Sequence, residues 1–310
     1  MTKFRIVFMG TPEFAVSSLQ KLVENGCDVV AVVTAPDKPA GRGLQLTPSP
    51  VKQYAMTQGI PVLQPEKLKN PDFLTELRSY QADLQVVVAF RMLPEAVWNM
   101  PPKGTFNLHA SLLPQYRGAA PIHWAIINGE TQTGVTTFFL EHEIDTGKII
   151  FQETEPIHDH DDVGTLYERL MHKGAELTVR TVKAVEAGDY PQTPQPNPEV
   201  LKSAPKIFKE TCEINWQQPS ETVRNFVRGL SPYPTAWTTL NGKLCKIFKV
   251  ETVKNPSENT SEPALRTDNK SYLHFKTTDG WVAVEQLQSE GKKRMGIEEF
   301  LRGTKLTLNA

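Results

Sequence analysis

The sequence has few cysteines, and they are not grouped. Its 310 residues include only Cys27, Cys212 and Cys245, which are widely spaced and never form a Cys-x-x-Cys pair. An odd, scattered set argues against a disulfide framework and a zinc knuckle, and is typical of a reducing compartment. The seven histidines show no i, i+4 pairing suited to metal binding, so we predict no metal site.

Long apolar runs are also missing. The start of the chain contains a short one, but Arg5 interrupts it and Gly-Thr-Pro-Glu follows at once, so it predicts a first strand rather than a secretory signal. No run approaches the length needed to cross a membrane. We therefore expect a cytoplasmic enzyme or binding protein with no membrane partner.

The chain lacks a strong excess of charge of either sign. Its net charge of −1 hides an asymmetry, because residues 206–310 carry 16 lysines and arginines against 12 acids, whereas residues 1–205 carry 18 against 23. A mildly basic C-terminal part is compatible with a polyanionic partner, although an excess of this size also arises by chance.

Two nucleotide-binding motifs are absent as well. No Gly-x-Gly-x-x-Gly follows the first apolar segment, and the chain has no Walker A loop. A dinucleotide or nucleoside triphosphate site therefore loses its main support.

The first half of the chain alternates strand-like and helix-like segments. Continuous apolar runs of this length are typical of buried parallel strands, and they occupy residues 4–10, 28–34, 84–90, 105–111 and 135–141. A helix is predicted between the first two, with Thr11 as cap, Pro12 in the first turn and Gly26 at the end. This βαβ opening predicts an α/β fold with a doubly wound, mostly parallel sheet.

A second helix and a proline-rich segment follow. An apolar stripe predicts a long helix over residues 164–188. Five prolines between residues 191 and 205 predict an extended linker. We therefore expect an N-terminal catalytic domain over residues 1–189, a linker over residues 190–205 and a C-terminal domain over residues 206–310.

The C-terminal domain has a different pattern. A short helix is predicted over residues 221–230 and a last one over residues 296–302. Between them lie alternating strands with turn signals at Asn241-Gly242 and Asp279-Gly280. The polar residues 255–269 are predicted to form a loop. The whole pattern favours a small antiparallel, OB-like β-barrel.

Asn107 and His109 are the first candidates for chemistry. Residues two apart on a strand share one face, here near the carboxyl end of a strand, which is where doubly wound sheets bind ligands. A neutral imidazole accepts a proton and an amide stabilises an oxyanion, so the pair suits acyl transfer. Asp145 is the candidate carboxylate to orient the imidazole, although Asp-Thr-Gly is also an ordinary turn.

Several longer stretches carry a family resemblance. The segment FNLHASLLPQYRGAAP, followed by TGVTTFFLEHEIDTG, closely resembles the formyltransferases that use 10-formyltetrahydrofolate. IVFMGTPEFAV, APDKPAGRGLQLTPSPVK and SAPKI are similar to the branch that formylates methionine on initiator tRNA. The resemblance runs nearly end to end and includes the small barrel.

The resemblance implies a role for particular residues. Asn107, His109 and Asp145 match the family's catalytic residues. The folate cosubstrate would lie near Ser111, Leu112, Leu113 and Pro114, with Phe90 and Leu93 in the same apolar cleft. Initiator Met-tRNA would contact Arg42, Lys38 and Lys206. In this chain GLQL follows Gly-Arg-Gly where other members carry lysines, and Arg91-Met92 replaces a longer stretch of small residues.

Three other functions fit part of the pattern. A formyltransferase acting on an amino sugar-nucleotide shares the two-domain plan but is expected to lack the AGRG loop. A glycinamide ribonucleotide formyltransferase needs no C-terminal barrel. A non-catalytic folate- or tRNA-binding module would not need Asn107, His109 and Asp145 together.

Overall fold

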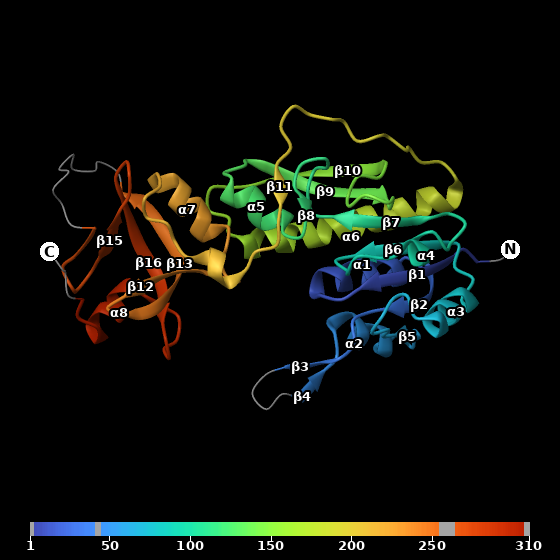
Figure 1. Ribbon diagram of the computed structural model, residues 1–310, viewed down its shortest axis with the longest axis horizontal. Helices are drawn as coiled ribbons and strands as arrows, with labels where there is room; N and C mark the ends of the chain where they lie inside the picture. The colour runs from blue at the N-terminus through green and yellow to red at the C-terminus, as the bar shows by residue number, and fades with distance from the viewer. Residues whose placement is uncertain (1–2, 41–44, 254–263, 307–310) are drawn as a thin grey trace. The chain divides into compact units, whose positions relative to one another are not determined.

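The computed structural model describes residues 3–40, 45–253 and 264–306 (Figure 1). The chain divides into two compact units, each built from separate stretches of sequence. The first unit contains Met1–Arg117, Thr133–Glu155 and Tyr167–Lys202, and the second contains Gly118–Gln132, Pro156–Leu166 and Ser203–Ala310. None of the helices within the described ranges is long and apolar enough to span a bilayer.

The first unit is an α/β layer structure. Its elements up to the central strand are β1 (Arg5–Gly10), α1 (Glu13–Glu24), β2 (Asp28–Val33), β3 (Lys38–Ala40), β4 (Gln45–Thr47), α2 (Pro50–Thr57), β5 (Val62–Leu63), α3 (Pro71–Ser79), β6 (Leu84–Val88), α4 (Glu95–Trp98) and β7 (Thr105–His109). The elements that follow are β8 (Arg117–Gly118), α5 (Pro121–Ile127), β9 (Gln132–Phe139), β10 (Ile149–Pro156), α6 (Val163–Ala187) and β11 (Ser203–Ala204), of which α5 and β11 belong to the second unit.

The main sheet confirms the predicted strands but corrects one direction. Within the described residues its strand order is β10-β9-β7-β6-β1-β2-β5. Strands β1, β2, β5, β6 and β7 are mutually parallel, whereas β9 runs antiparallel to β7. The expectation of a parallel strand over residues 135–141 was wrong, because a run buried on both faces has the same composition in either direction. Strand β10 was not predicted, since its second half alternates with polar residues.

The helices of this unit largely follow the sequence pattern. Helix α6 confirms the long predicted helix, and its Gly174 lies so close to Leu108 of β7 that a Cβ there would be 2.7 Å from the Leu108 side chain. Helix α1 begins one residue later than expected, with Pro12 at the N-cap and no side-chain cap bond, so the predicted role of Thr11 was wrong. Gly26 follows α1 with a φ of +73°, as a helix-ending glycine requires.

The second unit contains the antiparallel sheet. Its C-terminal elements are the 3₁₀ helix η1 (Lys209–Cys212), α7 (Ser220–Arg228), β12 (Ala236–Leu240), β13 (Lys243–Val253), β14 (Leu265–Thr267), β15 (Leu273–Lys276), β16 (Trp281–Ser289), β17 (Met295–Gly296) and α8 (Ile297–Gly303). The strand order is β12-β13-β16-β15-β14, with β17 against β16 and every pair antiparallel. This half-barrel is consistent with the OB-like prediction.

Two local predictions can be judged in this sheet. The hairpin between β12 and β13 turns at Asn241 and Gly242, whose φ angles of +47° and +72° are those of a type I′ turn. The polar loop predicted for residues 255–269 was wrong at Leu265–Thr267, which form β14, while residues 254–263 lie outside the described part.

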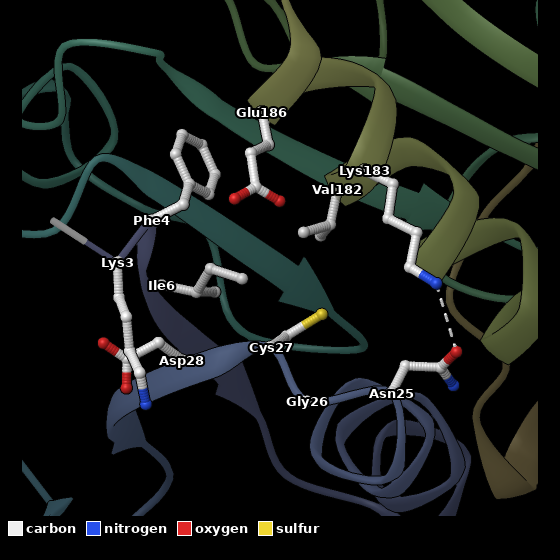
Figure 2. Close-up of a pocket in the computed structure, with 10 residues that line it drawn as sticks. All are labelled: Lys3, Phe4, Ile6, Asn25, Gly26, Cys27, Asp28, Val182, Lys183 and Glu186. Carbon is white, nitrogen blue, oxygen red and sulfur yellow. Dashed lines mark hydrogen bonds between the residues drawn. The ribbon is translucent and has the colours of Figure 1, made fainter. Parts of the chain in front are cut away.

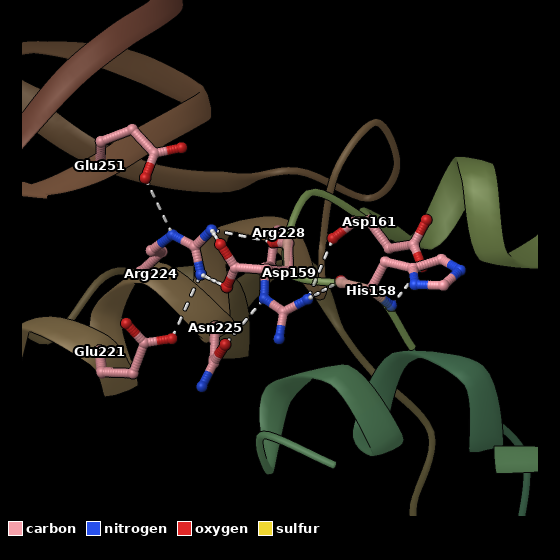
Figure 3. Close-up of polar contacts among 8 residues, drawn as sticks. All are labelled: His158, Asp159, Asp161, Glu221, Arg224, Asn225, Arg228 and Glu251. Atoms are coloured by element: carbon pink, nitrogen blue, oxygen red, sulfur yellow. Dashed lines mark hydrogen bonds and ion pairs between the residues drawn. The ribbon is translucent and has the colours of Figure 1, made fainter. Parts of the chain in front are cut away.

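A polar cluster ties the segment before α6 to α7 within the second unit (Figure 3). The Arg224 guanidinium contacts the carboxylates of Asp159 at 2.9 Å, Glu221 at 3.2 Å and Glu251 at 3.1 Å. Arg228 donates to the backbone carbonyl of Asp161 at 3.1 Å. These contacts fix residues 158–161 against α7 by charge-assisted hydrogen bonds rather than by apolar packing.

Candidate active site

Strand β7 presents Asn107 and His109 on one face of the main sheet. Leu108, between them, points to the other face, where it meets Gly174 of α6. Asn107 lies in register with Val87 of β6 and Phe138 of β9, and His109 lies opposite Thr136 of β9. The strand therefore presents the amide and the imidazole together at its carboxyl end, as the two-residue period predicts.

The His109 ring is buried, with 7% of its side chain exposed. Its Nε2 lies 2.8 Å from the backbone carbonyl oxygen of Tyr116, a distance at which an N–H donates a hydrogen bond. A carbonyl only accepts, so in the neutral ring Nε2 carries the proton and Nδ1 is left as the acceptor. Tyr116 has a φ of +60°, a left-handed conformation that aims its carbonyl at the ring.

Asp145 lies on the Nδ1 side of the same ring. Its Oδ2 is 3.9 Å from Nδ1, and 13% of its side chain is exposed. That distance is too long for a hydrogen bond but places a negative charge directly beside the imidazole. The structure therefore brings together the histidine and the carboxylate that the sequence pattern predicted, although the ring is oriented by Tyr116.

The turn that carries Asp145 is tightly constrained. Asp145 itself has a φ of +56°, a region that aspartate tolerates better than most residues. Gly147 follows, and a Cβ at that position would lie 1.7 Å from the Phe139 carbonyl oxygen. Only glycine therefore fits at position 147 without a shift of the backbone. From the sequence alone, Asp-Thr-Gly predicted no more than an ordinary turn.

Gln195 contacts this turn from the proline-rich segment. Its Nε2 donates to the carbonyl oxygens of Asp145 at 2.7 Å and Gly147 at 2.9 Å. Its Oε1 accepts from Arg117, at 3.2 Å from Nε and 2.6 Å from Nη2. Composition predicted a linker here, so sequence reasoning missed Gln195.

Residues 111–114 form a hydrogen-bonded loop directly after β7. The Ser111 hydroxyl donates to the Gln115 carbonyl at 2.7 Å. Thr136 donates to the Ser111 carbonyl at 2.7 Å and accepts from the Leu113 amide at 3.2 Å. The Leu113 carbonyl accepts from Gln152 at 2.9 Å. The polar backbone groups of Leu113 are thus engaged within the protein, and the segment is built from buried side chains at Ser111, Leu113 and Pro114 and a half-buried one at Leu112.

Two apolar clusters adjoin this part of the sheet. Leu113 packs with Phe138 and Ile149. Phe90 and Leu93 belong to a larger cluster that includes Val87, the neighbour of Asn107 in register. Leu140 packs against both clusters. Three of the predicted folate-binding residues, Leu113, Phe90 and Leu93, therefore belong to adjoining apolar groups on the Asn107 side of the sheet.

The predicted tRNA-binding residues are not part of this site. Lys38 is exposed on β3, which pairs with β4 to form a hairpin. Arg42 lies outside the described residues. Lys206 belongs to the second unit, where its ammonium is 5.3 Å from the centre of the Phe208 ring.

A cavity of about 160 Å³ lies at the amino-terminal ends of β1 and β2 (Figure 2). Residues before and at the start of β1 and β2 line it, together with Val182, Lys183 and Glu186 of α6. Burial raises the pKa of the Cys27 thiol in its wall, which keeps that cysteine protonated and poorly nucleophilic. The candidate residues Asn107 and His109 lie toward the carboxyl end of β7 and do not line this cavity.

Sequence comparisons give a single family for the whole chain. Residues 4–182 match the family described as formyl transferase, and residues 206–305 match the formyl transferase C-terminal domain. A methionyl-tRNA formyltransferase of Parabacteroides distasonis is 58% identical over 312 residues, covering 97% of this chain and 96% of its own. A relative of the same name from Bacteroides fragilis is 56% identical, covering 98% and 96%.

Solved structures show the same fold at lower identity. WlaRD, a sugar 3N-formyl transferase crystallised in the presence of dTDP and 5-N-formyl-THF, has a TM-score of 0.68 and 20% identity, covering 94% of this chain and 100% of that one. HypX from Aquifex aeolicus in complex with tetrahydrofolic acid has a TM-score of 0.65 and 21% identity, covering 99% of this chain and 49% of that one. These likenesses confirm the predicted formyltransferase fold.

Proposed function

The chain belongs to the formyl transferase family, and from this we propose that it transfers a formyl group from 10-formyltetrahydrofolate to the amino group of methionine on initiator tRNA. The observation that carries the proposal is the identity of 56–58%, over nearly the whole of both chains, with relatives named methionyl-tRNA formyltransferase. Since this reaction prepares the initiator tRNA for translation, we also propose a cytoplasmic location.

The arrangement around His109 supports a direct transfer. The amine attacks the formyl carbon, a C–N bond forms, and the formyl oxygen becomes an oxyanion to which the Asn107 amide donates. Removal of one such donor costs about 10²–10³ in rate. The bond to N10 then breaks, and one proton passes from the amine to N10.

His109 carries that proton through Nδ1. Because Nε2 donates to the Tyr116 carbonyl, Nδ1 is the nitrogen that accepts a proton from the attacking amine. The ring then becomes a cation, and the Asp145 carboxylate at 3.9 Å stabilises it. Asp145 thus acts by charge, while the Tyr116 carbonyl sets the orientation of the ring.

The folate would bind mainly through apolar contacts. Leu113, Phe90 and Leu93 supply apolar surface on the Asn107 side of the sheet. The Leu113 amide already donates its one N–H to Thr136, so it does not read the edge of the pterin. We assign residues 111–114 to shaping the cleft, with polar recognition supplied by other groups.

The tRNA would bind through phosphate contacts in the Arg42 and Lys38 loop and through the basic residues 206–310, which begin with Lys206. Such contacts make affinity depend on salt, and each lost phosphate contact lowers the slope of log K against log salt by about one. Lys38→Ala and Arg42→Ala should therefore raise KM for tRNA and flatten the salt dependence. Unchanged tRNA kinetics would refute the assignment of this loop.

One assay tests the proposed function directly. Purified protein is mixed with 10-formyltetrahydrofolate and Met-tRNA, and the product is analysed for N-formylmethionine, with an amino sugar-nucleotide as the competing acceptor. We expect formylation of the methionyl amine and none of the sugar amine. Formylation of the sugar alone, or of neither acceptor, would overturn the proposal.

A further inference from the structure

We propose that Gln195 is a positioning residue for the transfer reaction, because its amide fixes the turn that holds Asp145 beside His109. The inference rests on the proposed function, since it assigns Gln195 to the same site. It concerns a residue of the proline-rich segment, outside the sheet and outside the matched region that ends at residue 182.

The donor half of the amide spans the turn. Both Nε2 contacts, at 2.7 Å to the Asp145 carbonyl and 2.9 Å to the Gly147 carbonyl, are within hydrogen-bond range. A side-chain amide has two N–H groups, and here each has its own acceptor on either side of Thr146. The turn is therefore held at both ends by one side chain.

The acceptor half of the amide is held by a charge. Oε1 accepts from Nε and Nη2 of Arg117, at 3.2 and 2.6 Å. A guanidinium only donates and backbone carbonyls only accept, so chemistry allows one orientation of the amide. The Arg117 charge also polarises the amide, which strengthens the hydrogen bonds that Nε2 donates.

The turn needs an external brace. Asp145 has a left-handed backbone and Gly147 lies against the Phe139 carbonyl, a conformation that persists only when the surroundings impose it. The segment that carries Gln195 is itself anchored, because Thr193 exchanges two hydrogen bonds with Ile149 at 2.8 and 2.9 Å. Gln195 is half-buried, whereas Pro194 and Pro196 on either side are exposed.

Two adjacent residues thus orient both members of the His109–Asp145 pair. Tyr116 holds the imidazole through its carbonyl, and Arg117 holds the Asp145 turn through Gln195. The 3.9 Å separation between the imidazole and the carboxylate depends on both braces. Loss of Gln195 frees the turn and lets the carboxylate move away from the ring.

Three variants test whether Gln195 positions Asp145 beside His109 or only stabilises the proline-rich segment. Gln195→Leu removes both halves of the amide, Gln195→Glu keeps the acceptor for Arg117 but removes the donors, and Gln192→Leu makes the same chemical change at an exposed position three residues earlier. Each is assayed for kcat, KM for Met-tRNA, the pH profile of kcat and thermal stability. The pH titration of the His109 ring, followed by NMR, reports on Asp145 without requiring turnover.

We expect Gln195→Leu and Gln195→Glu to lower kcat by about 10- to 100-fold with little change in KM, because misplacement by about 1 Å costs up to about 10²-fold. Their pH profiles and His109 titrations should move toward those of Asp145→Asn, while Gln192→Leu matches the wild type. A Gln195→Leu enzyme with wild-type kcat and His109 titration would overturn the inference. So would a lower kcat with an unmoved titration, or a fully active Gln195→Glu. If the wild type formylates neither acceptor, the proposed function fails instead, and the His109 titration still decides the role of Gln195.

Discussion

His109 and Arg224 are buried basic side chains with the same exposure, 7%, and each lies beside carboxylates in one of the two compact units. Arg224 meets three carboxylates at 2.9–3.2 Å and also donates to the Asp159 carbonyl at 2.8 Å (Figure 3). Among the residues that the structure describes, His109 hydrogen-bonds to a carbonyl at 2.8 Å and has one carboxylate beside it, at 3.9 Å. The two side chains are thus equally buried, but a positive charge on Arg224 has many more hydrogen-bond and ion-pair partners than one on His109.

The difference shows in the balance of electrostatic effects at Arg224. Burial lowers the pKa of its guanidinium, but the hydrogen bonds that it donates to Asp159 and the charges of Glu251, Asp159 and Glu221 outweigh burial and raise that pKa. The cation is therefore permanent, and its contacts are structural. At His109 the carboxylate is near enough to stabilise a cation, but at 3.9 Å from Nδ1 it is too far for a hydrogen bond.

The largest effect on either property should come from removing the His109 imidazole, and it should be an effect on kcat. We expect His109→Ala to lower kcat by about 10²–10⁴, since proton transfer of this kind contributes about that much. Thermal stability should change little, because the loss of the hydrogen bond to Tyr116 is partly offset by no longer burying a polar ring. Steady-state kinetics with Met-tRNA measures the first quantity and a thermal melt the second. A variant with near-wild-type kcat would remove His109 from the mechanism.

Removing the Arg224 guanidinium should instead affect stability and leave the reaction rate nearly unchanged. We expect Arg224→Met to lower the free energy of unfolding by about 2 kcal/mol and to leave kcat within about twofold. Removing one partner of a fully buried pair costs about 3–5 kcal/mol, but here Asp159 and Glu221 are 87% and 59% exposed and can be hydrated instead. Urea unfolding followed by tryptophan fluorescence tests this. A large loss of kcat with unchanged stability would show that the cluster serves the reaction.

The sequence pattern predicted the elements that depend on local periodicity. The buried strands, the long helix α6 and the Asn241-Gly242 turn all follow from side-chain period and turn chemistry. Strand direction was not predictable for β9, because burial on both faces erases the difference. The prolines of the 191–205 segment predicted an extended linker and gave no sign that Thr193 pairs with Ile149.

The site was predictable to a similar degree. That Asn107 and His109 share one face follows from strand period, and Asp145 was predicted beside the imidazole from its place just after a strand. The braces from Tyr116 and Gln195 were not predictable, because one acts through its carbonyl and the other lies 50 residues beyond the turn it holds. Contacts of a backbone carbonyl or of a distant amide leave no pattern in a single sequence.

His123 is a third basic side chain to compare; it is half-buried, and its ring donates to the Gly229 carbonyl at 3.0 Å. Burial lowers the pKa of this histidine below its ordinary value of 6.5, and the bond to Gly229 opposes the shift only partly. The unfolded chain then binds more protons than the folded one, so stability present above pH 6.5 is lost as the pH falls toward the lowered value. One proton corresponds to a slope of at most about 1.4 kcal/mol per pH unit.

The measurement is the difference between wild type and His123→Gln in unfolding free energy from pH 7 down to 5. We expect a flatter pH dependence in the variant, with exposed His160→Gln as the control. Identical slopes in wild type and His123→Gln would mean that His123 has the same proton affinity folded and unfolded.

The smallest effect should come from trimming one acid of the Arg224 cluster. Glu221→Gln removes a charge that is 59% exposed and 3.2 Å from a guanidinium with two other carboxylate partners. Exposed pairs of this kind contribute about 0–1 kcal/mol, so we expect a change within about 0.5 kcal/mol in urea unfolding. Asp159→Asn, which weakens two contacts at 2.9 and 3.0 Å, should cost more. If Glu221→Gln lowered the free energy of unfolding as much as Arg224→Met, the three acids would act as one cooperative network. The Arg224 cation would then be stabilised more strongly, relative to His109 with its one carboxylate at 3.9 Å, than the separate distances indicate.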